Sequence, residues 1–178
     1  PIEMCISSAR NQVLFRMQGK GESDHGGFNQ VDLVSQLIDA KFPDYTAIVP
    51  KSYTTRATVD TAALLKAVRP AFLFARDAAN NIRLAIAPGA DDRPGKITLR
   101  ANSAEVGDNV SELDASLVEG EPIEIAFNAR YLMDLLQTVD TPQVLLETTY
   151  ANRPGVFRPV GAGPEEFTHV IMPMQLTR

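Results

Sequence analysis

Few side chains in this sequence have the chemistry and spacing that catalysis or metal binding requires. The chain has two histidines, His25 and His169, and one cysteine, Cys5, all far apart along the sequence. A zinc site needs several Cys or His ligands at short, characteristic spacings. A single histidine in a strand-like segment, such as His169, is usually structural. We therefore expect no metal, no cofactor and no catalytic histidine.

Acidic and glycine-rich segments suggest no clearer chemistry. The pairs Asp91-Asp92 and Glu165-Glu166 stand beside Gly and Pro, which indicates solvated charges in turns. Segment 19–21, Gly-Lys-Gly, lacks the spacing and the Lys-Ser/Thr of a phosphate-binding loop. No Gly-x-Ser-x-Gly nucleophile elbow is present. A small acidic enzyme whose site assembles from distant residues stays open as an alternative, although no motif supports it.

The composition is that of an acidic globular chain. Its 178 residues are 44% hydrophobic and 22% charged, with a formal net charge of -5. These values exclude a disordered, collagen-like or disulfide-rich chain. They also argue against binding nucleic acid over the whole surface, so such a role needs a local basic face. With no apolar run of about 18 residues and no signal peptide, we expect a cytoplasmic protein without membrane contact.

Residues 1–50 are expected to form three strands followed by a linker. Alternating apolar residues predict strands at 2–6, 13–17 and 30–38. Three strands without a helix leave one face of a sheet uncovered. The chain also begins at Pro1 without an initiator Met, so we expect an excerpt that starts inside a domain. Pro43 and Pro50 disfavour a central strand and indicate a linker.

The rest of the chain repeats one pattern of elements. Each copy starts with a strand and a capping residue, Asp60 or Asn128, and continues with apolar residues at helical spacing and three more strands. We therefore predict a duplicated α+β domain. The first copy has strands at 52–59, 82–87, 96–101 and 111–118 and a helix that includes Leu64, Leu65, Val68 and Phe72; the second has strands at 122–127, 144–148, 155–160 and 167–172 and a helix that includes 131–139.

Four segments carry a family resemblance, and their order along the whole chain makes it specific. They are 37–45 (LIDAKFPDY) with Val49-Pro50, 64–66 (LLK), 125–132 (IAFNARYL) and 170–176 (VIMPMQL). Together they resemble the bacterial sliding clamp family, the beta subunit of DNA polymerase III. The resemblance implies a clamp-type domain, doubled as β-α-β-β-β. It assigns 1–50 to the last strands of the middle clamp domain plus a linker, and 51–178 to the third domain.

The resemblance also implies a function without catalysis. Clamp chains pair head to tail into a homodimeric ring around double-stranded DNA, with their helices lining the hole. The ring tethers the replicative polymerase, and the clamp loader and repair proteins bind it through a short hydrophobic motif. A stand-alone protein-interaction module that shares the clamp fold is the alternative function. Upstream sequence would distinguish the two.

The resemblance places three sites on this chain. DNA-facing candidates are Lys66, Arg69, Arg76 and Arg130, while Pro70 replaces a frequent basic residue and is expected to kink or shorten the first helix. Ring-interface candidates are Phe72, Leu73 and Phe74. Three consecutive residues of a helix cannot all face the protein core, so some of them must point away from it. The partner-peptide pocket is assigned to Pro43, Ile48, Gly155, Val170, Met172, Pro173 and Met174. Ala47 stands where the family has an Arg and Gln175 where it has a basic residue, and both changes are expected to weaken polar contacts at the rim of this pocket.

Overall fold

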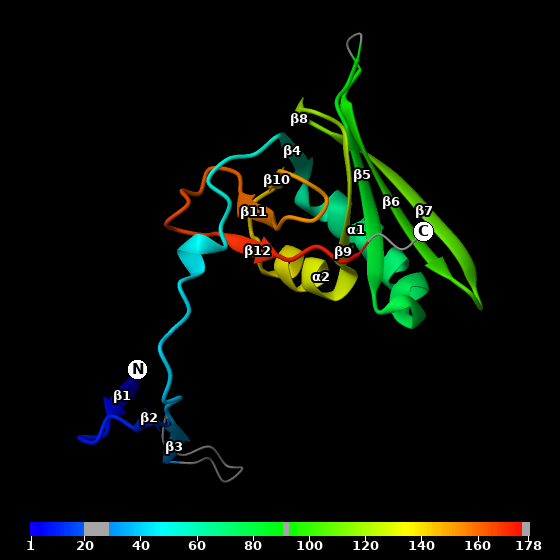
Figure 1. Ribbon diagram of the computed structural model, residues 1–178. Coiled ribbons are helices and arrows are strands. Elements are labelled where there is room, and N and C mark those ends of the chain that lie inside the picture. The colour runs from blue at the N-terminus through cyan, green and yellow to red at the C-terminus, as the bar shows by residue number, and fades with distance from the viewer. Residues whose placement is uncertain (20–28, 91–92, 176–178) are drawn as a thin grey trace. The chain divides into compact units, whose positions relative to one another are not determined.

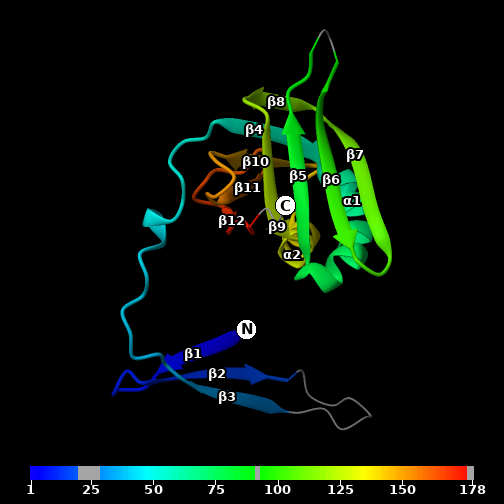
Figure 2. The same cartoon turned by 45° about the vertical axis from the view of Figure 1, so that its right-hand side comes forward.

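The computed structural model describes residues 1–19, 29–90 and 93–175, which fall into two units (Figures 1 and 2). The first unit comprises Pro1–Asp44 and the second Tyr45–Arg178. Each unit is described by itself. None of the helices in the described ranges is long and apolar enough to cross a membrane.

The first unit is a three-stranded antiparallel sheet in the order β1-β2-β3. The strands are β1 (Ile2–Ile6), β2 (Gln12–Gln18) and β3 (Gln30–Gln36), so the three predicted strands are confirmed. Met4 pairs with Phe15, and Phe15 pairs with Leu33, which places these apolar side chains on one face. Met4 is 61% exposed and Leu33 is 57% exposed. Among the described residues of this unit, no layer covers this apolar face.

The second unit has two antiparallel sheets and two α-helices. Its five-stranded sheet has the order β12-β11-β10-β4-β8, and its four-stranded sheet has the order β7-β6-β5-β9. The elements are η1 (Tyr45–Ala47), β4 (Thr55–Asp60), α1 (Thr61–Ala75), η2 (Arg76–Ala78), β5 (Asn81–Ala87), β6 (Gly95–Ser103), β7 (Gly107–Ala115), β8 (Leu117–Gly120), β9 (Ile123–Asn128), α2 (Ala129–Thr138), β10 (Gln143–Thr148), β11 (Gly155–Pro159) and β12 (His169–Ile171).

The two predicted copies exchange their first strands. β4 precedes α1 in the chain but pairs with β10 of the second copy, with Val59 opposite Val144. β9 precedes α2 but pairs with β5 of the first copy, with Leu84 opposite Ile125. Neither copy completes its sheet alone, so the duplicated sequence folds as one unit with one core.

The prediction of a single strand over 111–118 is wrong. β7 ends at Ala115 in the four-stranded sheet, and β8 begins at Leu117 in the five-stranded sheet. Ser116, between them, donates hydrogen bonds from its backbone N (2.9 Å) and its Oγ (3.1 Å) to the Thr58 carbonyl oxygen. These two bonds hold the chain against β4, so the single predicted strand is divided between two sheets.

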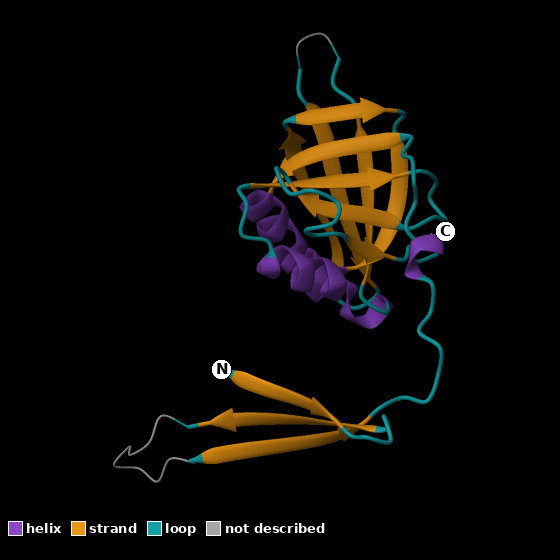
Figure 3. Ribbon diagram, turned by 90° about the vertical axis from the view of Figure 1, so that its left-hand side faces the viewer, coloured by secondary structure: helices purple, strands orange, loops and turns teal. Residues whose placement is uncertain are grey.

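Both helices begin at the predicted capping residues and cover the same side of the strands (Figure 3). Asp60 Oδ1 accepts a hydrogen bond from the Ala63 N–H (2.7 Å), and Asn128 Oδ1 accepts one from the Arg130 N–H (3.0 Å). Each cap satisfies a donor that the helix cannot pair internally. The two helices pack against each other. Their buried residues and the inner faces of the strands form the core, which includes Leu64, Val68, Ile82, Leu84, Ile97, Leu99, Ile125, Phe127, Leu132, Leu135, Leu146 and Phe157.

Pro70 does not shorten the first helix, so that half of the expectation is wrong, while the kink stays a prediction. α1 continues through Pro70 to Ala75. A proline inside a helix removes the hydrogen bond to the carbonyl four residues earlier, which here belongs to Lys66. Lys66 lies on the exposed side of α1, so water can reach that turn. The buried residues Val68 and Ala71 hold the helix against the core on both sides of the proline.

Candidate functional site

The four predicted DNA-facing cations lie on the layer formed by the helices. Lys66 and Arg69 belong to α1, Arg76 begins η2 directly after it, and Arg130 lies in the first turn of α2. All four residues are exposed. None of them forms an ion pair with any residue that the structure describes. Their charges therefore face solvent uncompensated by a direct partner.

Two acidic residues share this layer and weaken its positive potential. Asp77 lies in η2 and Asp134 lies in α2, and both are exposed. The cations nevertheless outnumber these two acids, in a chain whose net charge is -5. Such a face can attract phosphates without a fixed geometry, because exposed charges act through solvent over about a Debye length.

Leu73 is the member of the predicted ring interface that faces solvent. It is 59% exposed, whereas Phe72 and Phe74 are partly buried against the core. This agrees with the expectation that three consecutive apolar residues on a helix cannot all face inward. α1 also packs against β7, which forms one edge of the four-stranded sheet. Sequence reasoning missed this edge, because the pairing of strands decides which strand has an open side.

The C-terminal segment forms a second candidate site. The Met174 N–H donates a hydrogen bond to the Ala126 carbonyl oxygen (2.8 Å), which fixes the segment beside β9. Met172 is 61% exposed, and Val170, Pro173 and Met174 are partly buried. A cavity of about 500 Å³ lies here, lined by Ala151, Asn152, Met172, Pro173, Met174 and Gln175. Ala151 and Asn152 come from the β10–β11 connection, and no pattern in the sequence pointed to them.

Ile48 and Gly155, two further predicted pocket residues of the second unit, do not line this cavity. Pro43 belongs to the first unit. Ile48 follows η1, is 50% exposed, and donates its backbone N–H to the Tyr45 carbonyl oxygen (2.9 Å). Gly155 is buried and lies against the Phe127 ring. The assignment of these residues to a partner pocket stays a prediction, and for Gly155 the structure gives a packing reason instead.

The rim substitutions are on the surface. Ala47 lies in η1 and is exposed. Gln175 lines the C-terminal cavity, and its carbonyl oxygen accepts a hydrogen bond from Asn81 Nδ2 (3.1 Å). Its backbone is thus held in place while its side chain is exposed.

Among the described residues, the titratable groups that the sequence singled out form no metal-binding cluster. His169 is half-buried in β12, and this burial lowers the pKa of its imidazole despite the opposing charge of Asp134. Glu165 and Glu166 lie exposed in a turn, where Glu166 Oε2 accepts the Gly163 N–H (2.9 Å). In the described ranges, no group of three or more His, Cys, Asp or Glu could hold a metal. His25, Lys20, Gly21, Asp91 and Asp92 lie outside the described residues.

Known proteins of one family are similar to this chain. Residues 46–175 match the model of the family described as "DNA polymerase III beta subunit, C-terminal domain". The chain belongs to this family. It is 30% identical over 170 residues to the beta sliding clamp of Staphylococcus aureus, which covers 96% of this chain and 40% of the relative. It is 31% identical over 144 residues to the Synechococcus elongatus beta sliding clamp, which covers 81% of this chain and 36% of the relative.

Solved structures of the beta subunit family have the same fold. The Bacillus subtilis DNA polymerase sliding clamp is similar with a TM-score of 0.78 at 27% identity, covering 99% of this chain and 41% of that one. Caulobacter crescentus pol III beta gives a TM-score of 0.75 at 27% identity, covering 98% and 41%. The predicted clamp-type α+β fold is thus confirmed. The chain spans about 40% of the length of these beta subunits.

Proposed function

We propose that this chain is the C-terminal part of a DNA sliding clamp, a non-catalytic processivity factor that encircles duplex DNA and tethers the replicative polymerase. In this proposal, residues 1–50 are the end of the middle domain with its linker, and 51–178 are the third domain. Membership of the beta subunit family supports the fold and the general role. Since replication proteins of bacteria work beside the chromosome, the proposal also places the protein in the cytoplasm.

The observation that carries the DNA-binding part is the layer of exposed, unpaired cations on α1, η2 and α2. A clamp must attract phosphates without holding one sequence or one register. Contacts between Lys or Arg and phosphate supply this kind of attraction, because they release counterions and do not read bases. The acidic net charge of the chain limits the attraction to one face and keeps it weak.

Ring closure is proposed to use Leu73 together with the open edge of β7. An exposed leucine on a helix beside an unpaired strand edge offers both an apolar contact and backbone hydrogen bonds to a second chain. Because the family relatives are longer, we propose that the partner surface lies on another part of a full-length chain. The ring is then head to tail rather than symmetric about this surface.

Partner binding is proposed to use the C-terminal cavity. Met172 and Met174 give it a flexible, polarizable wall, which suits apolar side chains of different shapes. A short hydrophobic motif of the polymerase, the clamp loader or repair proteins would bind there. Pro43 and Ile48 are proposed to contribute from the linker.

The DNA-binding proposal can be tested by adding a duplex of random sequence to the ¹⁵N-labelled chain at about 10 mM ionic strength, where the Debye length is about 30 Å. We expect amide shifts confined to α1, η2 and α2. Replacing Lys66, Arg69, Arg76 and Arg130 together with Gln should abolish them. A matched control replaces four exposed cations elsewhere, namely Lys41, Arg93, Arg100 and Arg153, and loses the same net charge. That variant should keep most of the shifts.

Salt dependence gives a second measure. For the unchanged chain, a plot of the logarithm of the DNA association constant against the logarithm of the salt concentration should have a negative slope of about 0.9 for each phosphate contact. Equal losses in both variants would mean that overall charge, not this layer, attracts DNA. Absence of any duplex-induced shift, with peptide binding retained, would favour a protein-interaction module that shares the clamp fold.

A further inference from the structure

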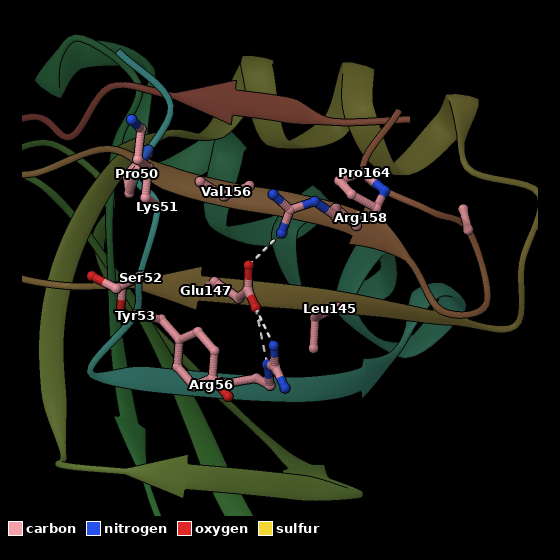
Figure 4. A pocket seen from close by; sticks show the side chains of 12 residues that line it. Pro50, Lys51, Ser52, Tyr53, Arg56, Leu145, Glu147, Val156, Arg158 and Pro164 are labelled. Carbon is pink, nitrogen blue, oxygen red and sulfur yellow. Dashed lines mark hydrogen bonds and ion pairs between the residues drawn. The ribbon is translucent and has the colours of Figure 1, made fainter. Parts of the chain in front are cut away.

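A separate pocket lies on the face of the five-stranded sheet that points away from the core (Figure 4). Ala57 and Leu146 are buried under the helices, so their strand neighbours Arg56 and Glu147 point to the opposite face. The pocket has a volume of about 360 Å³. Its lining comes from β4, β10, β11, the segment 50–53 and the turn that contains Pro164.

Two arginines share one glutamate at the centre of this pocket. Arg56 donates from Nε (3.0 Å) and Nη2 (2.6 Å) to Glu147 Oε1, and Arg158 donates from Nη1 to Glu147 Oε2 (Figure 4). Glu147 has only 12% of its side chain exposed, Arg158 has 16% and Arg56 has 32%. One carboxylate thus fixes two guanidinium groups in place before any ligand arrives.

The pocket has more cations than acidic residues in its lining, and some of its hydrogen-bond donors have no acceptor among the described residues. Lys51 also lines it, so three cations face one acidic lining residue. Arg158 uses Nε and Nη1 on Thr168 and Glu147, which leaves Nη2 without a partner in the described part of the chain. Among the described residues, the nearest acidic group to Arg56 Nη1 outside Glu147 is the Glu119 carboxylate, at 3.9 Å. An arginine carries five N–H donors in a planar fork, so each retains donors for a further acceptor.

Apolar groups surround these donors. Tyr53 holds Arg56 from one side, with the guanidinium carbon 4.0 Å from the ring centroid. Leu145 and Val156 lie on the strands beneath, and Pro50 and Pro164 lie at the sides (Figure 4). A ligand with an acid next to an aliphatic or aromatic group would match both parts of this lining.

We propose that this pocket binds a carboxylate side chain of a partner protein, presented in a short segment where an acidic residue adjoins an apolar one. The planar carboxylate fits the fork geometry of the arginine donors. A phosphate dianion fits less well, because Glu147 remains at the centre and repels the second charge. The site lies in a different cavity from the C-terminal segment and does not depend on the proposed function.

Peptide titration by NMR tests the proposal on the intact chain. The probe is acetyl-Leu-Glu-Leu-Glu-amide, and the matched control is acetyl-Leu-Gln-Leu-Gln-amide. We expect saturable shifts of amides in β10 and β11 and of the Arg56 and Arg158 Nε–H groups with the first peptide only. Lys51→Gln removes an exposed cation and should weaken binding about two- to fivefold, the usual effect of one exposed charge. Lys41→Gln, the same change at an exposed lysine outside the pocket and outside the cation layer, should leave the affinity unchanged.

Glu147→Gln separates a binding role from a structural one. The neutral amide keeps the size of the side chain and an oxygen that accepts from a guanidinium group, and it raises the net charge of the pocket by one, so affinity for the acidic peptide should rise. If Glu147 serves only to hold the strands together, this variant will show no gain. Equal binding of both peptides, shifts confined to the C-terminal cavity, tighter binding of inorganic phosphate, or no saturable shift at millimolar peptide would each overturn the proposal.

Discussion

Gly155→Ala offers a sharp test of how the core of the second unit is built. A Cβ added at Gly155 would lie 2.4 Å from Phe127 Cζ, 3.0 Å from Phe127 Cε1 and 3.4 Å from Phe157 Cε2. Carbon atoms prefer separations of about 3.5–4.0 Å, so the Phe127 ring would have to move by about 1 Å. Both rings are fully buried and meet edge to face, 5.7 Å apart at 66°.

The expected cost is that of overpacking, about 1–3 kcal/mol. For a unit of this size, this corresponds to a fall in Tm of about 3 to 10 °C. Urea unfolding followed by far-UV circular dichroism measures the free energy, and calorimetry measures Tm. Gly163→Ala is the matched control, because its Cβ would meet only Glu166 side-chain atoms, at 3.9 Å or beyond. That variant should change stability by no more than about 0.5 kcal/mol.

A double mutant identifies the clash itself. Phe127→Leu shortens the opposing side chain, so Gly155→Ala should cost at least about 0.5 kcal/mol less in that background than in the unchanged chain. The reasoning is refuted if Gly155→Ala is as stable as the unchanged chain, or if the two costs simply add. A loss of motif-peptide affinity at unchanged stability would instead support Gly155 as a pocket residue.

Three further predictions concern single residues. Asp60→Ala should lower the free energy of unfolding in urea by about 1 kcal/mol, because the α1 cap is lost, whereas Asp60→Asn should keep most of the capping stabilisation. Equal losses in the two variants would contradict the capping role. Leu73→Gln should stay within about 0.5 kcal/mol of the unchanged chain because Leu73 is 59% exposed, while the buried Leu64→Ala on the same helix should cost about 2–5 kcal/mol. Burial lowers the His169 pKa, so the unfolded state binds the proton more tightly and stability should fall as pH drops below about 6.5. His169→Gln should flatten that fall, and an unchanged pH profile would count against the burial.

Local patterns were sufficient to predict most elements of the second unit. The caps Asp60 and Asn128 and the apolar spacing of both helices depend on residues within a few positions of one another, and the structure has both helices where these patterns put them. The same holds for the paired strands β5 and β6. Local sequence could not predict the end of β7, because the strand ends where the Ser116 N–H donates a hydrogen bond to the carbonyl oxygen of Thr58, a residue far away in sequence.

The candidate sites were less predictable because they depend on partners far apart in sequence. Arg56 and Glu147 come from strands of different copies and meet only because β4 pairs with β10. Ala151 and Asn152 reach the C-terminal cavity through a loop with no distinctive pattern. Pro70 was expected from a local rule to shorten the helix, but α1 continues to Ala75. Val68 and Ala71, buried on either side of the proline, hold the helix against the core.

Each of the two copies supplies a different one of the proposed binding surfaces. The first copy supplies α1, η2 and the β7 edge, and with them Leu73 and most of the exposed cations. The second supplies α2, β12 and the segment after it, which lines the C-terminal cavity. Because β4 and β9 cross between the copies, both surfaces rest on one shared core. Under the proposed function, substitutions at Leu73 should therefore impair ring closure without affecting peptide binding, and substitutions at Met172 should do the reverse, whereas a core change such as Gly155→Ala should weaken both.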